Sequence, residues 1–177
     1  MTRSAAHWLR SAALVTLASA GVAWSARAQA PTTSSPLAPL TFLAGHCWRG
    51  TFPDGKRADE HCFEWFYDGR FLRDRHVVTG DAEEYGGETV YYWDAAARQV
   101  QYIYFTSKGG VSRGSVQPDA DALRFPEERY TGPRGTTEVY RSTWRASGDG
   151  AYTVVAETLR DGAWVEAWHM RMQRRAR

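Results

Sequence analysis

Residues 46–79, HCWRGTFPDGKRADEHCFEWFYDGRFLRDRHVVT, decide the fold of this 177-residue chain. Two Asp-Gly pairs, at 54–55 and 68–69, separate three runs in which apolar and polar residues alternate. An alternation with period two is typical of a half-buried β-strand. Asp-Gly is typical of the type I′ turn of a tight hairpin, in which both central residues need a positive φ. The stretch therefore predicts three antiparallel strands joined by short turns.

Two-residue turns also fix which residues face each other across the strands. The predicted partners are Cys47 with Cys62, Trp48 with His61, His61 with His76, and Phe63 with Asp74. One face of this sheet is largely aromatic and aliphatic. The other face pairs charges of opposite sign, with Arg49, Glu60, Glu64, Arg73 and Arg75 beside the cysteines. Since paired charges belong in water, we expect the aromatic face to lie inside.

The rest of the chain continues the same pattern. Short aromatic and β-branched runs are separated by Gly and Asp, and no window carries the apolar stripe of an amphipathic helix. Eight Trp, nine Tyr and seven Phe supply a large core. The predicted strands are 46–52, 58–67, 70–79, 87–94, 98–107, 110–117, 121–131, 135–146, 151–160 and 163–174, preceded by a short helical turn over 40–45. We predict an all-β fold, a ten-stranded antiparallel up-and-down barrel, because closure removes exposed strand edges.

A third Asp-Gly pair, at 161–162, predicts the last hairpin. A two-residue turn there places Glu157 opposite Glu166, Val155 opposite Trp168, and Thr153 opposite Met170. The apolar members of this set favour an inward face. Two adjacent carboxylates would then form a paired acid site, although an exposed rim position or a shifted register also fits. The same register points His169 outward, together with Val154 and Tyr152.

Residues 1–28 have the pattern of a secretory signal sequence. Arg3 and Arg10 precede an apolar segment over 11–24, and Ala26-Arg27-Ala28 supplies a cleavage site. Residues 29–39 are rich in Pro, Ser and Thr and predict a flexible leader before a domain over 40–177. We therefore expect a periplasmic or secreted protein without an integral membrane segment after cleavage. The mature chain would be nearly neutral, which disfavours a nucleic-acid partner.

The two cysteines are expected to form a disulfide, because the protein is predicted to be exported and Cys47 faces Cys62. Counting from a two-residue turn makes them a hydrogen-bonded pair, with Cα atoms about 5.5 Å apart. That separation still permits a bond. No CxxC motif or second thiol pair supports a redox or metal site.

The predicted inner face carries a group of polar side chains. His61 and His76 are expected neighbours, with Asp74 and His46 one step along. Two imidazoles and a carboxylate have the chemistry to bind a metal or to accept a proton. They also fit ordinary buried histidines with hydrogen-bond partners. No nucleophile, phosphate-binding or zinc-protease motif is present in the sequence, so no catalytic residue is assigned.

Further along the chain, Val100, Tyr102 and Tyr104 alternate with Gln99 and Gln101, which predicts that the apolar set points inward. A barrel of eight or more strands has room for a ligand. Tyrosines lining that room would combine apolar walls with a few polar anchors.

The stretch over 40–50, LTFLAGHCWRG, resembles the opening of lipocalin-like calycin barrels, including nitrobindins. In those proteins a short helix leads into a Gly-x-Trp strand whose Trp plugs the barrel base. This chain has Gly-x-x-Trp instead. The segments DGRFL at 68–72, YWD at 92–94 and SKGG at 107–110 resemble a bacterial lipocalin-like domain of unknown function. The resemblance implies an internal cavity that binds a small apolar molecule.

Our leading hypothesis is an exported barrel that binds a small hydrophobic molecule. Its expected ligand-binding residues are Trp48, Phe63, Trp65, Tyr102 and Tyr104 as walls, with His61 and His76 as polar anchors. The nitrobindin resemblance implies haem binding through a last-strand histidine, for which His169 is similar in place; its predicted outward direction disagrees. The sequence also fits an enzyme that uses His61, His76 and Asp74, or a non-catalytic envelope protein that binds a partner on its outer face.

Overall fold

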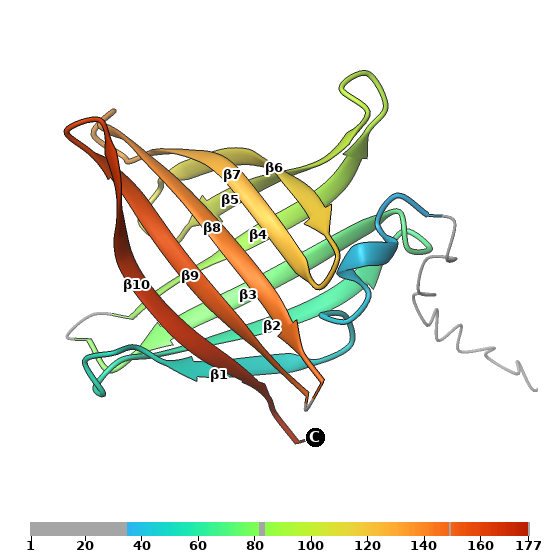
Figure 1. Ribbon diagram of the computed structural model, residues 1–177, viewed down its shortest axis with the longest axis horizontal. Helices are drawn as coiled ribbons and strands as arrows, with labels where there is room; N and C mark the ends of the chain where they lie inside the picture. Colours follow the sequence, from blue (N-terminus) through green and yellow to red (C-terminus); the bar gives the residue numbers. More distant parts are fainter. Residues whose placement is uncertain (1–34, 82–83, 149, 177) are drawn as a thin grey trace, which may run out of the picture.

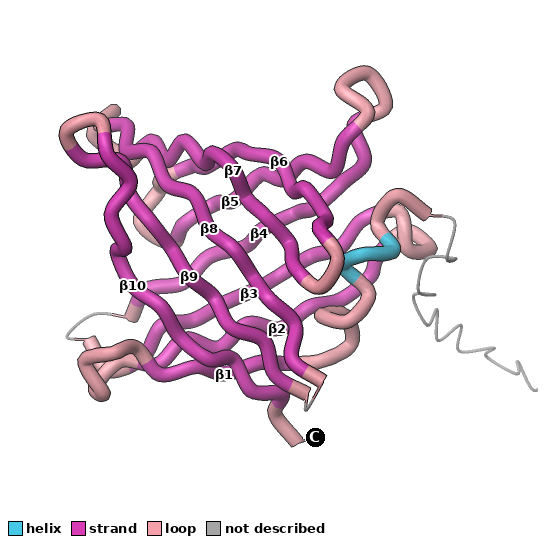
Figure 2. The backbone as a smooth tube through the Cα atoms, viewed as in Figure 1, coloured by secondary structure: helices cyan, strands magenta, loops and turns pink. Residues whose placement is uncertain are grey.

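The computed structural model describes residues 35–81, 84–148 and 150–176, which form one closed barrel of ten antiparallel strands (Figure 1). Each strand pairs with its neighbours in the chain, and β1 pairs with β10. Figure 2 shows that strands make up most of the described chain, with a short helix at one end. The predicted all-β, up-and-down barrel is confirmed.

The strand boundaries lie close to the predicted ones. They are β1 (Cys47–Thr51), β2 (Ala58–Phe66), β3 (Phe71–Thr79), β4 (Tyr85–Asp94), β5 (Gln99–Thr106), β6 (Val111–Asp119), β7 (Ala122–Thr131), β8 (Thr137–Ser147), β9 (Ala151–Arg160) and β10 (Ala163–Arg174). The barrel closes where β1 meets β10, through the pairs Trp48–Arg174 and Arg49–Gln173.

The predicted register of β1, β2 and β3 is confirmed at every pair, including Cys47 with Cys62 and His61 with His76. The cysteines form the predicted disulfide. The first turn differs from the prediction, because the Phe52 amide donates to the Arg57 carbonyl (2.9 Å) and so closes a longer loop over 53–56. This moves the alternation of ladder hydrogen bonds by one step. Cys47 and Cys62 therefore form a non-hydrogen-bonded pair, and their Cα atoms lie only 4.0 Å apart.

In the last hairpin, the residues of β9 occupy the opposite faces from those predicted. Its turn has the predicted form, with φ of 51° at Asp161 and 80° at Gly162. A register shift between Glu166 and Trp168 then places Trp168 opposite Ala156 and Met170 opposite Val154, so the predicted partners Val155 and Thr153 are wrong. Tyr152 and Val154, which were expected outside, are 1% and 4% exposed. A β-bulge inserts one residue and reverses the face on which the following side chains lie.

A plug of apolar residues fills the end of the barrel where the described chain begins. A 3-10 helix over Ala38–Leu40 and the turn after it bring Leu37, Leu40 and Leu43 against Trp48. The indole Nε1 of Trp48 donates to the Leu43 carbonyl at 3.0 Å. Leu37 is 2% exposed, so packed residues begin within the predicted leader over 29–39. The predicted signal sequence over 1–28 lies outside the described residues.

Candidate functional site

The interior of the barrel contains a cavity of about 1070 Å³. Its wall is formed mainly by aromatic and aliphatic side chains of the strands, among them Trp144, Tyr152 and Trp168. The lining extends to Pro53, Asp81 and Lys108, in loops at the end opposite the plug. A space bounded by a plug at one end and by loops at the other is suited to an internal ligand.

One side of the cavity carries a chain of hydrogen-bonded polar groups from β2 and β3. His61 Nδ1 lies 2.8 Å from Asp74 Oδ2, and His61 Nε2 lies 3.1 Å from Asp59 Oδ2. The other oxygen of Asp59, Oδ1, lies 3.0 Å from His76 Nδ1. The two imidazoles stack, with ring centroids 4.7 Å apart. The strand register produces this arrangement, because His61 and His76 are directly opposite and Asp59 lies two residues before His61 on the same face.

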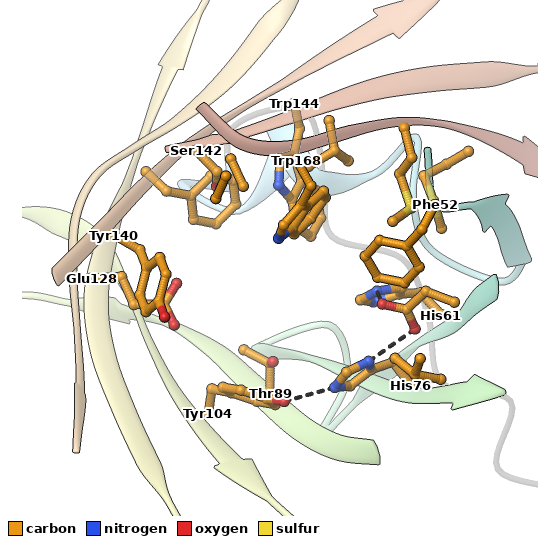
Figure 3. A pocket seen from close by; sticks show the side chains of 18 of the residues that line it. Phe52, His61, His76, Thr89, Tyr104, Glu128, Tyr140, Ser142, Trp144 and Trp168 are labelled. Carbon is orange, nitrogen blue, oxygen red and sulfur yellow. Dashed lines mark hydrogen bonds and ion pairs between the residues drawn. The ribbon is translucent and has the colours of Figure 1, made fainter. Parts of the chain in front are cut away.

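The chain of hydrogen bonds continues through two tyrosines. His76 Nε2 lies 2.8 Å from the Tyr104 hydroxyl (Figure 3). That hydroxyl lies 2.7 Å from the hydroxyl of Tyr85. Gly87 makes room for the Tyr104 ring: a Cβ built at this position would lie 2.3 Å from Tyr104 Cε2. Gly87 is also the β4 partner of His76. The absence of a side chain here thus lets a β5 tyrosine reach a β3 histidine.

The opposite charges of this cluster favour each other's ionised forms. Burial by itself would lower the pKa of His61, but the carboxylates of Asp74 and Asp59 outweigh it and raise the pKa of His61 to about 10. Burial would likewise raise the pKa of Asp59, yet His61 and His76 hold that pKa well below its usual value. Both ring nitrogens of His61 thus face a carboxyl group, an arrangement that favours the protonated imidazole. Asp59, Asp74 and His76 are each less than 10% exposed.

A second polar group lies on the facing side of the cavity, where Figure 3 shows Glu128 beside Tyr140. The Tyr102 hydroxyl donates to Glu128 Oε2 at 3.2 Å. Burial raises the pKa of Glu128, against the effect of that hydrogen bond. The cavity thus has a polar anchor on each of two sides, separated by aromatic side chains that include Trp144 and Trp168.

The predicted ligand-binding residues fall into two groups. His61, His76, Tyr102 and Tyr104 line the cavity as expected. Trp48, Phe63 and Trp65 lie in the packed core and are 3%, 2% and 8% exposed, but they are not among the residues that line the cavity. Trp48 instead contacts Phe42 and Tyr152 at the plugged end.

Sequence reasoning missed Asp59, Glu128 and Trp144. The inward position of Asp59 could have been predicted, because Asp59 extends the alternation of the inward-facing residues His61, Phe63 and Trp65 by one step. The position of Glu128 could not be predicted, because register shifts in the pairing of β7 with both of its neighbours obscure which face its residues occupy. Trp144 is on β8, where alternation alone does not distinguish a cavity wall from a packed core.

The remaining candidates lie on the outer surface. The side chain of His169 is 63% exposed and its Nδ1 lies 2.6 Å from Glu166 Oε1, so it does not reach the cavity. Its predicted outward direction is confirmed, and haem bound inside the barrel would need another ligand. Glu157 faces Glu166 as predicted, on the outside, where it binds Arg141. The hydrogen bonds from Arg141 lower the pKa of Glu157. No paired acid site is formed by these two described residues.

The class defined by these features is a closed ten-stranded antiparallel barrel with an internal cavity and a buried His–Asp cluster. No protein-family model and no curated protein matches this chain. No helix within the described ranges has both the length and the apolar character needed to cross a membrane.

Proposed function

We propose that this protein is an exported lipocalin-like barrel that binds a small, largely apolar molecule. The observation that carries the proposal is the internal cavity, whose volume of about 1070 Å³ slightly exceeds the usual range of about 300–1,000 Å³ for small-molecule sites. Aromatic walls that carry polar groups at fixed positions are also typical of such sites.

The disulfide and the amino-terminal sequence support export. A disulfide persists in oxidising compartments such as the bacterial periplasm or the extracellular space, and the Cys47–Cys62 bond joins the first two strands. The pattern over residues 1–28 is that of a secretory signal. The order of motifs over 40–110 resembles lipocalin-like domains, for which binding inside the barrel is the expected activity.

The positions of the polar groups suggest the kind of ligand. An apolar body would contact Trp144 and Trp168, while a polar group on the ligand would reach either the His–Asp cluster or Glu128. Polar groups in a cavity discriminate strongly, because a ligand that shields them from water without hydrogen bonding to them binds less tightly. We therefore expect a small amphipathic molecule to bind more tightly than a pure hydrocarbon.

The test places a large side chain in the cavity at a position that has a matched control. Ala156 lines the cavity, and its neighbour Val155 lies on the outer face of the same strand. Binding of the fluorescent probe N-phenyl-1-naphthylamine is titrated against the wild type, Ala156→Phe and Val155→Phe, and a thermal melt of each variant checks folding. We expect saturable binding to the wild type, at least a tenfold loss in Ala156→Phe, and no change in Val155→Phe. Equal binding by all three proteins would place the probe outside the barrel and overturn the proposal.

A further inference from the structure

We propose that Asp59, His61 and His76 form a binding site for a divalent transition metal on the cavity wall. One potential ligand atom from each residue lies within 4.8 Å of the other two. The site does not depend on an apolar ligand, because all three of its residues come from the wall formed by β2 and β3. It can therefore be tested without any organic ligand.

The donor set matches the chemistry of such metals. Two imidazole nitrogens and one carboxylate oxygen suit Zn²⁺, Fe²⁺ and Co²⁺ rather than Ca²⁺ or Mg²⁺, which prefer oxygen ligands alone. The nitrogens that face Asp59 are His61 Nε2, at 3.1 Å, and His76 Nδ1, at 3.0 Å. Neighbouring donors on a tetrahedral zinc ion, each about 2.0–2.1 Å from the metal, are themselves about 3.3 Å apart. The two nitrogens contact different oxygens of Asp59, and the donor atoms of the three residues lie within 4.8 Å of one another, so the stacked imidazoles must rotate and move closer together to coordinate one ion.

The orientation of each imidazole is also fixed by a hydrogen bond at the ring nitrogen that does not face Asp59. Nδ1 of His61 is hydrogen-bonded to Asp74, and Nε2 of His76 is hydrogen-bonded to Tyr104. Histidines that bind metals almost always use the other ring nitrogen in this way, and a carboxylate is a frequent partner. A metal at Nε2 of His61 replaces the proton on that nitrogen, which is released to solvent. A metal at Nδ1 of His76 leaves the ring proton on Nε2, which donates to the Tyr104 hydroxyl. That hydroxyl can rotate and donate onward to Tyr85, which lies 2.7 Å away.

The surroundings favour a metal with an open coordination position. Asp59, His61 and His76 all line the cavity, and Figure 3 shows both histidines on its wall. Three protein ligands leave at least one position free, and here that position faces the cavity. A bound ion would be accessible to a donor atom of a molecule inside the barrel.

In addition, Asp74 Oδ1 is buried and has no hydrogen-bond partner among the described residues, which leaves Asp74 directed at His61 alone.

The experiment uses the full-length protein without a histidine tag, treated with EDTA and dialysed. Zn²⁺ binding is measured by isothermal titration calorimetry, and bound Co²⁺ by its visible absorption. We expect one ion per chain in the wild type. Asp59→Asn and His76→Ala should each lower the Zn²⁺ affinity by more than about 100-fold, whereas Asp74→Asn, which alters an orienting group, should lower it by about 10–100-fold.

Two controls make the result decisive. His169→Ala removes the exposed histidine that pairs with Glu166 and could bind metal at the surface; we expect this variant to retain full affinity. In ¹⁵N spectra of the wild type, Zn²⁺ should shift the ring nitrogens of His61 and His76, a readout that does not depend on any variant folding. Absence of one-to-one binding in the wild type would overturn the proposal, as would loss of binding in His169→Ala or shifts confined to His169. Any of these outcomes would make the cluster a hydrogen-bonded network only. None of them would affect the binding of N-phenyl-1-naphthylamine.

Discussion

The disulfide between β1 and β2 gives the sharpest stability prediction. Cys47 and Cys62 are half-buried on the outer face, so changing both to Ser creates no cavity in the core. Their bond closes a loop of 15 residues. On the chain-entropy model, removing this constraint from the unfolded chain costs about 3 kcal/mol of stability. For a domain of this size, about 3 kcal/mol corresponds to a decrease of roughly 6–12 °C in the unfolding midpoint.

The assay compares urea and thermal unfolding of the wild type with the Cys47→Ser/Cys62→Ser double variant, followed by tryptophan fluorescence. A matched control is Arg49→Ser/Glu60→Ser, which removes a partly exposed ion pair of 3.7 Å on the same face of the same two strands, and with it the 3.6 Å contact of Glu60 with Arg175. That pair should contribute at most about 1 kcal/mol. If the two double variants lose the same stability, the loss comes from surface contacts between β1 and β2. The reasoning from the cross-link is then refuted.

Three further predictions concern the plug and the His–Asp cluster. Leu43→Ala should destabilise the protein by about 2–5 kcal/mol in urea unfolding, because Leu43 is fully buried in the plug; a loss below about 1 kcal/mol would mean that the plug is not packed. Gly87→Ala should cost about 1–3 kcal/mol by displacing Tyr104 and the Phe105 carbonyl, whereas Gly148→Ala, whose Cβ meets nothing within 4 Å, should be nearly neutral. The raised pKa of His61 stabilises the metal-free fold fully below pH 6.5, and this contribution should be lost as the pH rises toward about 10. Urea unfolding in EDTA should show a shallower decline in His61→Gln, and an equal decline would contradict the assignment.

The sequence predicts the fold well where turn chemistry and alternation agree. The Asp-Gly turns at 54–55 and 68–69 give the register of three strands, and this register alone places His61 beside His76. The predicted register of β1 and β2 is correct even though their loop is longer than expected, because the loop extends equally on both sides of Asp54-Gly55. A symmetric extension changes which pairs are hydrogen-bonded without changing which residues face each other.

The sequence fails where a bulge intervenes. The register shift after Glu166 reverses the pattern expected for the last hairpin, so Tyr152 and Val154 lie inside, while Val155 is 36% exposed. All of these residues are compatible with a strand on either face, and none of them indicates where an extra residue enters the ladder. The register shifts in the pairing of β7 hide Glu128 for the same reason. Alternation therefore predicts a face only as far as the next bulge.

The seam between β1 and β10 has a consequence for the order in which the chain folds. The pairs Trp48–Arg174 and Arg49–Gln173 join the first strand to the last, so the ring closes only when β10 pairs with β1. Before that moment, β1 has a free edge, and the leading edge of the growing sheet is also unpaired. Free edges of this kind recruit strands from other chains. A chain shortened within β10 should therefore associate through these edges, and slow closure of such sequence-distant contacts should limit the rate of refolding.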